Sequence, residues 1–252
     1  MPRLGAFLAF FAASATAVGQ TSHAPAPFLP GESMEYAVSY GVIPAGQLTI
    51  RVAGLETYQG RSAYHLVSEA KSNRAVSVLY ELASSEESWL DAEGLYSLRY
   101  RRVSTENDKT RERDVRFDQQ RHLRIYSDGA TSPTSPRAVD QLAMIYYMRT
   151  LPVGPGKTFL LQNQADPEDN PVTIRVLKRE RIRVPAGSFD TWVVDIEVKT
   201  DRGIFKKGGE NRVWVTADAR RVPVKISSKI GIGSFAAELV DYSRGQPVDS
   251  AR

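Results

Sequence analysis

The sequence predicts an all-β fold, mainly antiparallel. We expect a curved sheet, half-barrel or sandwich of about 10–13 strands with one amphipathic helix near residues 136–150. Three observations support this. Apolar and polar residues alternate along many short segments, turn residues separate these segments, and a single segment has the periodicity of a helix.

The alternation begins at Glu32, and it is clearest at residues 34–40 and 48–52. A period of two indicates a strand with one buried face. Asn107-Asp108-Lys109 and Asp128-Gly129 are typical turn sequences. The other predicted strands lie near residues 64–68, 84–90, 95–105, 110–117, 121–127, 157–163, 172–184, 190–200, 210–216, 221–229 and 234–242. Short strands joined by short turns predict an antiparallel sheet.

Two turn sequences resemble each other. Ile43-Pro44-Ala45-Gly46 and Val184-Pro185-Ala186-Gly187 both carry proline at the second position and glycine at the fourth, and both precede a predicted strand. We interpret them as two tight turns of the same chemistry. An internal duplication is the alternative, but the flanking residues do not match.

One segment, Ser135–Leu151, has helical periodicity. Ser135 is a good N-cap and Pro136 suits the first helical position. Arg149 falls in the last turn, where the helix dipole favours a cation, and Pro152 ends the segment. An apolar face, formed by Ala138, Leu142, Ile145 and Tyr146, predicts that the helix packs on the sheet.

The N-terminus has the features of a secretory signal. Arg3 precedes an apolar run, Leu4–Ala13, and small residues follow at Ala15 and Ala17. We therefore predict a signal peptide at 1–17 cleaved after Ala17, a flexible leader at 18–31, one domain at 32–243 and a flexible tail at 244–252. A periplasmic location follows from the signal. Cleavage after Gly19 and a buried N-terminal helix are the alternatives.

The composition narrows the chemistry. The chain has no cysteine, which excludes disulfides, thiolate metal sites, a cysteine nucleophile and a lipidated N-terminal cysteine. After the signal, no segment approaches the roughly 20 apolar residues that a membrane-spanning helix needs. The net charge of +4 is compatible with an anionic lipid, a glycolipid or an acidic glycan as partner. Nucleic acid is not expected as a partner after export.

The sequence contains no recognisable catalytic centre. The three histidines, His23, His65 and His122, are far apart, and no paired zinc motif occurs. The Gly154–Thr158 segment ends like a phosphate-binding loop but follows a helix and precedes a strand, which is the wrong order. The acidic segment Asp166–Asn170 lacks the spacing of a calcium loop. We therefore expect no catalytic residues, no metal site and no cofactor.

Two groups of residues are candidates for ligand binding. Arginine binds phosphate and carboxylate through two parallel hydrogen bonds, and several arginines alternate along one predicted strand. Aromatic side chains are the second group, because they can line an apolar hollow. The candidate ligand-binding residues are Tyr146, Trp192, Trp214, Arg179, Arg181 and Arg183. The alternatives are ordinary core packing for the aromatics, and for the basic strands a solvated face whose cross-strand partners include Glu106, Glu112 and Asp114.

Several short segments, in this order and spacing, resemble the DUF3108 family of bacterial exported proteins. They are Tyr36–Tyr40 with Gly46 after it, Asp140–Arg149, Val184–Phe189, Val213–Thr216 and Arg221–Val224. The resemblance extends from about Gly31 to Tyr242 and implies an all-β exported domain with one conspicuous helix. The family is named for lacking a known function, so it implies no catalytic residues.

These observations favour a non-enzymatic envelope protein that binds an amphiphile or assists envelope assembly. The apolar part of the amphiphile would contact the aromatic candidates, and its anionic head would contact the arginines. The second hypothesis is a structural module with a fully packed core that contacts another envelope protein. A glycan hydrolase is the third, and it would need two carboxylates about 5–10 Å apart in a cleft.

Overall fold

The computed structural model describes residues 26–77, 82–200, 205, 207–230 and 233–247. The predicted signal peptide and its cleavage site lie outside the described residues. The strands are β1 Glu32–Tyr40, β2 Ile43–Tyr58, β3 Arg61–Ser72, β4 Leu82–Asp91, β5 Ser97–Glu106, β6 Lys109–Asp118, β7 Leu123–Tyr126, β8 Thr131–Pro133, β9 Thr158–Leu161, β10 Val172–Val184, β11 Gly187–Glu197, β12 Glu210–Thr216, β13 Pro223–Ile230 and β14 Gly233–Arg244. The helices are α1 Arg74–Ser77, α2 Gln141–Arg149 and a short 3-10 turn, Pro167–Asp169.

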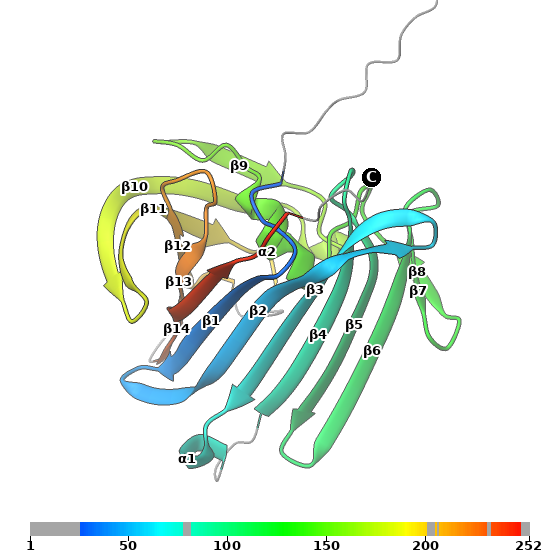
Figure 1. Cartoon of the computed structure of the whole chain (residues 1–252). Coiled ribbons are helices and arrows are strands. Elements are labelled where there is room, and N and C mark those ends of the chain that lie inside the picture. Colours follow the sequence, from blue (N-terminus) through cyan, green and yellow to red (C-terminus); the bar gives the residue numbers. More distant parts are fainter. Residues whose placement is uncertain (1–25, 78–81, 201–204, 206, 231–232, 248–252) are drawn as a thin grey trace, which may run out of the picture.

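The strands form one antiparallel sheet, which confirms the predicted fold class. Their order is β8-β7-β6-β5-β4-β3-β2-β1-β14-β13-β12-β11-β10-β9, so the first and last strands pair at the centre and the sheet stays open at β8 and β9. The sheet curves around α2, which lies on its concave side (Figure 1). None of the helices in the described part of the chain is long and apolar enough to cross a membrane.

The helix begins later than the sequence predicts. Val139 forms an isolated parallel bridge with Gln164, in which the Val139 N–H donates to Asn163 O and Val139 O accepts from the Ala165 N–H. Asp140, rather than Ser135, is the N-cap, and its carboxylate accepts from the backbone N–H groups of Leu142 and Ala143 at 3.0 and 2.9 Å. Pairing with a distant loop therefore overrides the local Ser-Pro start signal.

The predicted turn at 43–46 is also wrong, whereas the one at 184–187 is confirmed. Tyr40 pairs with Ile43, so the β1–β2 turn consists of Gly41 and Val42 alone. Gly41 has φ of +58°, the left-handed region that glycine adopts readily. A bulge on β2 accommodates the residues that follow Pro44, where the pairing register shifts.

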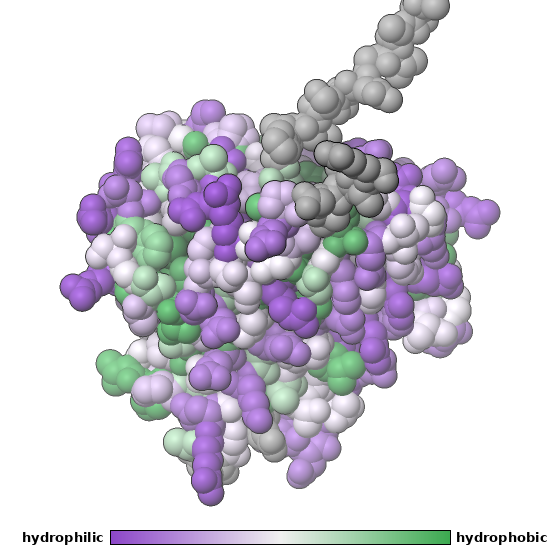
Figure 2. Space-filling view, viewed as in Figure 1, coloured by the Kyte–Doolittle hydropathy of each residue, from purple (hydrophilic) through white to green (hydrophobic). Residues whose placement is uncertain are grey.

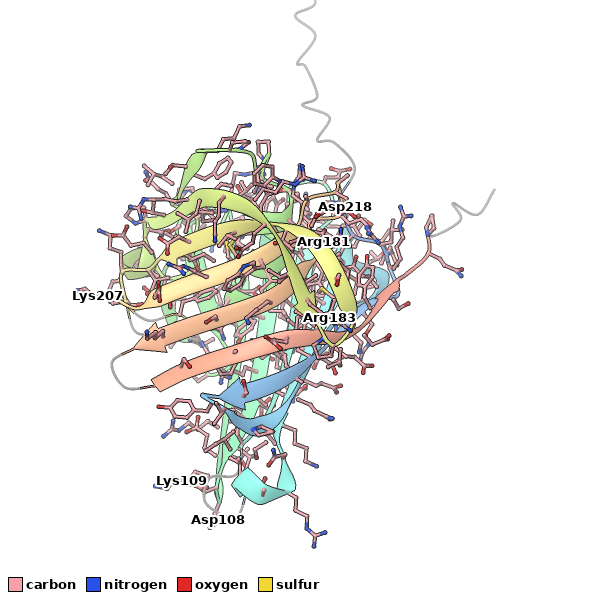
Figure 3. All side chains as sticks on the ribbon, turned by 90° about the vertical axis from the view of Figure 1, so that its left-hand side faces the viewer. Asp108, Lys109, Arg181, Arg183, Lys207 and Asp218 are labelled. Carbon is pink, nitrogen blue, oxygen red and sulfur yellow. The ribbon has the colours of Figure 1, made fainter. Side chains whose placement is uncertain are left out.

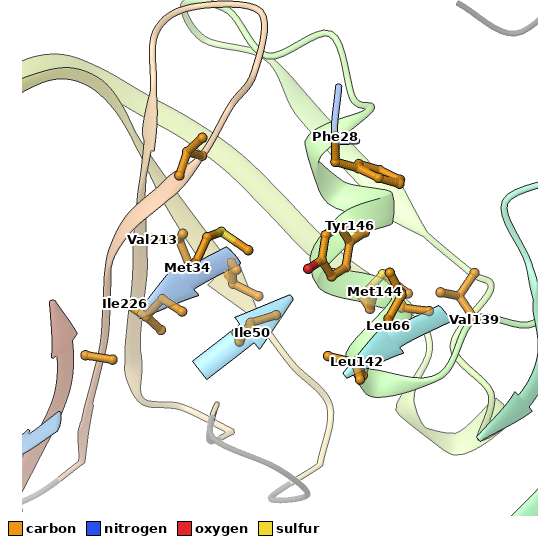
Figure 4. Close-up of a cluster of buried hydrophobic side chains, with 14 of the residues drawn as sticks. Phe28, Met34, Ile50, Leu66, Val139, Leu142, Met144, Tyr146, Val213 and Ile226 are labelled. Atoms are coloured by element: carbon orange, nitrogen blue, oxygen red, sulfur yellow. The ribbon is translucent and has the colours of Figure 1, made fainter. Parts of the chain in front are cut away.

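The core lies between the concave face and α2. Figure 4 shows part of it, with Phe28, Leu66 and Tyr146 close together. The Phe28 and Tyr146 rings meet edge to face at 4.9 Å, and α2 contacts β3 and β4. Residues 26–31 fall in the predicted leader, yet Phe28 is fully buried here. Each large apolar side chain buried in this way stabilises the fold by about 1.5–3 kcal/mol.

The basic strands β5 and β6 carry cross-strand ion pairs. Arg99 contacts Asp114 at 2.5 Å and Arg101 contacts Glu112 at 2.9 Å. Hydrogen bonds from Arg99 lower the pKa of Asp114, outweighing the opposing effect of burial. Arg99 and Arg101 are therefore partnered side chains of a solvated face, as the alternative interpretation of the sequence proposed.

Candidate functional site

An apolar cavity of about 60 Å³ lies between α2 and the C-terminal strands. Its lining comes from the helix, from the turn after it and from β10 to β13. The lining residues are Ile145, Met148, Arg149, Leu151, Val153, Ile174, Val194, Ile196, Phe205, Val213, Val215, Arg221, Pro223 and Ile226. All but the two arginines are apolar, so the cavity suits an apolar group.

The helix contributes residues both to the core cluster and to the cavity wall. Leu142 and Tyr146 belong to the core cluster that includes Leu66 of β3, whereas Ile145 and Met148 line the cavity. Across the cavity, alternate residues of β11 and β12 point inward, which places Val194 and Val213 in its wall. The cavity is therefore a gap within the same hydrophobic core, bounded by α2 on one side and by β11 and β12 on the other.

Arg149, at the end of α2, is fully buried, and its guanidinium is held by an ion pair and by hydrogen bonds. Its guanidinium makes two parallel bonds to Glu32 of β1, at 2.5 and 2.9 Å, and it also donates to Arg220 O at 3.1 Å. The Phe28 and Tyr146 rings lie against it, each 5.5 Å from the guanidinium carbon. Burial alone would lower the pKa of Arg149, but Glu32 raises it. Arg149 is therefore a structural cation.

Arg221 is the second arginine that lines the cavity, and its contacts differ from those of Arg149. It lies in the β12–β13 connection, where the Arg221 N–H donates to Asp218 O at 3.3 Å and φ is +47°. One of its guanidinium nitrogens donates to Arg149 O at 3.0 Å. Within the described residues Arg221 makes no ion pair, and it is only partly buried. The guanidinium of Arg221 is thus available to form an ion pair with an anionic ligand.

Of the residues predicted from the sequence, Tyr146 lies deepest. It is fully buried in the core, and burial raises its pKa well above the usual value. Its hydroxyl has no hydrogen-bond partner among the described residues. Tyr146 does not line the cavity, but its ring contacts the guanidinium of Arg149, which does.

The other five predicted residues lie on and around the β10–β11 hairpin. The Arg179 guanidinium carbon is 5.9 Å from the centre of the Trp192 ring, so these two are brought together. Trp214 of β12 is separate, because its indole N–H donates to Glu180 at 2.6 Å and Lys225 lies over its ring. Arg181 and Arg183 are exposed near the end of the hairpin (Figure 3). The structure thus groups none of these five with Tyr146.

The interior carboxylates of Asp140 and Glu86 accept hydrogen bonds from neighbouring groups of the fold. Asp140 accepts from the Ser88 and Ser97 hydroxyls at 2.6 and 2.5 Å as well as from two backbone N–H groups. Burial raises its pKa to about 6. Glu86, further along β4, accepts from Tyr100 at 2.8 Å. With its four donors, Asp140 acts as a helix cap rather than as a free acid or base.

The remaining polar candidates are also partnered. His65 lies beside Glu87 at 3.1 Å and stacks on Trp89, with ring centres 4.8 Å apart. In the acidic segment, Asp166 pairs with Arg124 at 3.3 Å and Asp169 accepts from Thr200. In the part of the chain that the structure describes, no group of three or more histidine or acidic residues could hold a metal ion.

Sequence reasoning missed the role of Glu32 and of Arg221. Glu32 and Arg149 are 117 positions apart, and no local pattern connects them. Arg221 appeared only as the first residue of a segment resembling a family motif. The one available signal for Glu32 was its place at the start of the alternating pattern, where the first even-numbered residue is a carboxylate facing inward.

One family model and several solved structures match the chain. No curated protein sequence matches the chain. Among solved structures, a β-barrel-like DUF1849 protein from Brucella abortus is 10% identical over 86% of this chain and 98% of that one, with a TM-score of 0.49. A DUF1089 family protein from Pseudomonas aeruginosa is 9% identical over 88% and 95%, with a TM-score of 0.38. The family model described as "Protein of unknown function (DUF3108)" matches residues 35–240, so the chain belongs to the DUF3108 family.

Proposed function

We propose that this protein is an exported, non-enzymatic binding protein that takes the end of an anionic amphiphile into the cavity beside α2. The observation that carries the proposal is the pairing of an apolar cavity with one cation, Arg221, that has no ion-pair partner in the described residues. An apolar chain end would occupy the cavity, and a carboxylate or phosphate would meet Arg221.

The size of the cavity limits the ligand. Pockets for drug-sized ligands usually measure about 300–1,000 Å³, and this cavity measures about 60 Å³. Only a few carbons fit inside it. The ligand we propose is therefore a single-chain amphiphile that inserts its end, and not a lipid that the protein encloses entirely. The sequence-based candidates Arg179, Arg181 and Arg183 remain a rival site for the anionic head.

Calorimetric titration with decanoate and decanol tests the proposal. Wild type is expected to bind decanoate at least about tenfold more tightly than decanol, because a charge-assisted hydrogen bond to Arg221 contributes about 1.5–3 kcal/mol. Arg221→Gln should bind the two equally. Arg181→Gln is the matched control, since Arg181 lies near the end of a hairpin with 69% of its side chain exposed, and it should leave the preference intact. A preference lost in the Arg181 variant and kept in the Arg221 variant would place the head on the hairpin instead.

Native mass spectrometry of the protein purified from its own envelope provides the second test. A bound single-chain species, identified after lipid extraction, is expected. If no amphiphile is bound and neither decanoate nor decanol binds, the amphiphile proposal is wrong.

The small cavity also favours a second candidate function, a module that contacts other envelope proteins. The core around Phe28 and Tyr146 is filled. Among the strands that the structure describes, none pairs with the outer edge of β9, and Leu160 on this strand is exposed. An exposed edge can accept a strand of a partner. Absence of any amphiphile together with an envelope protein that co-purifies, and is lost on Leu160→Pro, would support this function.

A further inference from the structure

The β1–β2 turn carries an apolar tip, which we define as Tyr40, Val42 and Ile43. Val42 is 97% exposed, and Tyr40 and Ile43 are each 58% exposed. The other large apolar residues that are exposed, such as Leu160 and Leu177, occur singly. In Figure 2 hydrophobic side chains project into solvent at the place where Figure 1 shows the β1–β2 turn.

The turn does not require an apolar side chain at Val42. Gly41 alone supplies the left-handed backbone of the turn, and small polar residues are the usual choice beside it. Val42 is almost completely solvated, so its side chain contributes little packing to the folded state. Contiguous exposed apolar side chains usually mark an interaction site. The tip is therefore a candidate contact surface.

Basic side chains surround the tip. Lys229 of β13 lines the same surface hollow as Tyr40 and Val42. Arg74 begins α1, which is held near the tip because the preceding residue, Asn73, donates to Pro44 O at 2.6 Å. Lys71 lies opposite Gln47 in the β2–β3 pair.

These cations are available to a partner. Lys71, Arg74 and Lys229 are exposed, and none of them makes an ion pair within the described residues. The acidic residue opposite Lys229 is Glu210, which is itself paired with Arg212 at 2.5 Å. The surroundings of the tip thus carry unneutralised positive charge.

We propose that the apolar tip docks the protein on a membrane surface rich in anionic lipids. Apolar side chains would enter the boundary between head groups and acyl chains, and the basic residues would contact lipid phosphates. Membrane binding of this kind grows with the buried apolar area and with electrostatic attraction to anionic lipids. The docking surface is separate from the cavity, and the inference does not rest on the proposed amphiphile binding.

The shape of the tip favours a bilayer over a second protein molecule. A stable protein interface buries about 800 Å² on each partner, usually through 20–30 residues. The tip is one projecting turn with three apolar side chains. A lipid surface yields to such a projection, whereas a protein partner would need a matching pocket.

Fluorescence of a labelled tip tests the proposal. The chain has no cysteine, so Val42→Cys carries a single label, such as an NBD dye. The assay uses the chain from residue 18, because the apolar segment 4–13 would itself bind vesicles. With phosphatidylglycerol vesicles we expect the NBD emission to rise severalfold and shift to the blue. Leu160→Cys, which is also exposed, is the matched control and should show no change.

Vesicle sedimentation provides the quantitative arm. Val42→Asp should weaken binding to phosphatidylglycerol vesicles about tenfold or more, since it replaces an inserting apolar group by an anion. The triple change of Lys71, Arg74 and Lys229 to Gln should reduce binding to the level seen with uncharged phosphatidylcholine. Val213→Phe, which narrows the cavity, should leave vesicle binding unchanged and so separates this inference from the proposed function.

Two results would overturn the inference. The first is that the wild-type protein does not bind phosphatidylglycerol vesicles, or that Val42→Asp does not weaken this binding. The other is a dimer in light scattering that Val42→Asp dissociates while vesicles are ignored, which would assign the tip to a second copy of the chain.

Discussion

The buried ion pair between Arg149 and Glu32 is the interaction whose disruption tests this fold most directly. It joins the last residue of α2 to the first residue of β1, and both side chains are almost completely inaccessible to solvent. Glu32 also accepts from the Tyr242 hydroxyl at 3.2 Å. Three segments far apart in sequence are therefore connected through one carboxylate.

The structure sets the size of the effect. In Glu32→Gln the guanidinium stays buried but loses its anion, and removing one partner of such a pair costs about 3–5 kcal/mol. Arg149→Met leaves Glu32 as an unpaired buried anion and deprives Arg220 O of both donors, so a similar or larger loss is expected. The double variant removes both charges. It should cost about as much as one single variant, not twice as much, giving a coupling energy of about 3 kcal/mol.

Urea unfolding, followed by tryptophan fluorescence and by circular dichroism, measures the four members of this cycle. The midpoint, the slope and the free energy of unfolding are compared at pH 7 and constant salt. Single variants that each cost less than about 1 kcal/mol, or a double variant equal to the sum of the singles, would refute the claim that the two charges depend on each other. Such a result would mean that water reaches the pair.

Two further predictions concern Asp140 and two glycines. Because burial raises the pKa of Asp140 to about 6 from an unfolded value near 4, the folded state binds the proton more tightly, so stability should fall by about 3 kcal/mol as pH rises from about 4 to 6 and then level off. Urea midpoints across this range should show that Asp140→Asn lacks this contribution, and an unchanged pH dependence would contradict it. Gly46→Ala should destabilise by about 1–3 kcal/mol, because its Cβ would overlap the Lys71 carbonyl, whereas Gly54→Ala, with no atom within 4 Å, should stay within about 0.5 kcal/mol. Equal melting temperatures for the two alanine variants would count against this steric reasoning.

The strands could be predicted because their signal is local. Alternation of apolar and polar side chains depends only on neighbours in sequence, and the predicted strand at 172–184 coincides with β10. The helix start could not be placed, because it depends on hydrogen bonds from Val139 to a loop 24 positions away at Asn163. The turn at Gly41-Val42 was missed for a related reason. Pro44 and Gly46 carry strong turn signals, but a bulge in β2 absorbs them.

The candidate site was much less predictable than the fold. Its aromatic candidates were chosen by residue type, and residue type does not distinguish the core position of Tyr146 from the position of Trp214 beside Glu180 and Lys225. Whether a cation is available to a ligand depends on whether it forms an ion pair within the fold. Arg149 and Arg221 are both basic residues beside the cavity, yet within the described part of the chain only Arg149 pairs with an anion, through a contact across 117 positions.

Arg221, the cation of the cavity that is available to a ligand, lies far from the apolar tip. Lys229, beside the apolar tip, lies six positions after Pro223 along β13, a length of roughly 20 Å at about 3.3 Å per residue, and Arg221 lies two positions before Pro223. This exceeds the distance of about 8–10 Å over which physiological salt screens charges. Arg221 should therefore contribute nothing to vesicle binding, and the anionic lipid fraction should leave the decanoate preference unchanged. Because Arg221 would lie away from a membrane docked at the tip, an anionic head group must reach it from solvent or by leaving the membrane first, which favours single-chain amphiphiles with measurable aqueous solubility over two-chain lipids.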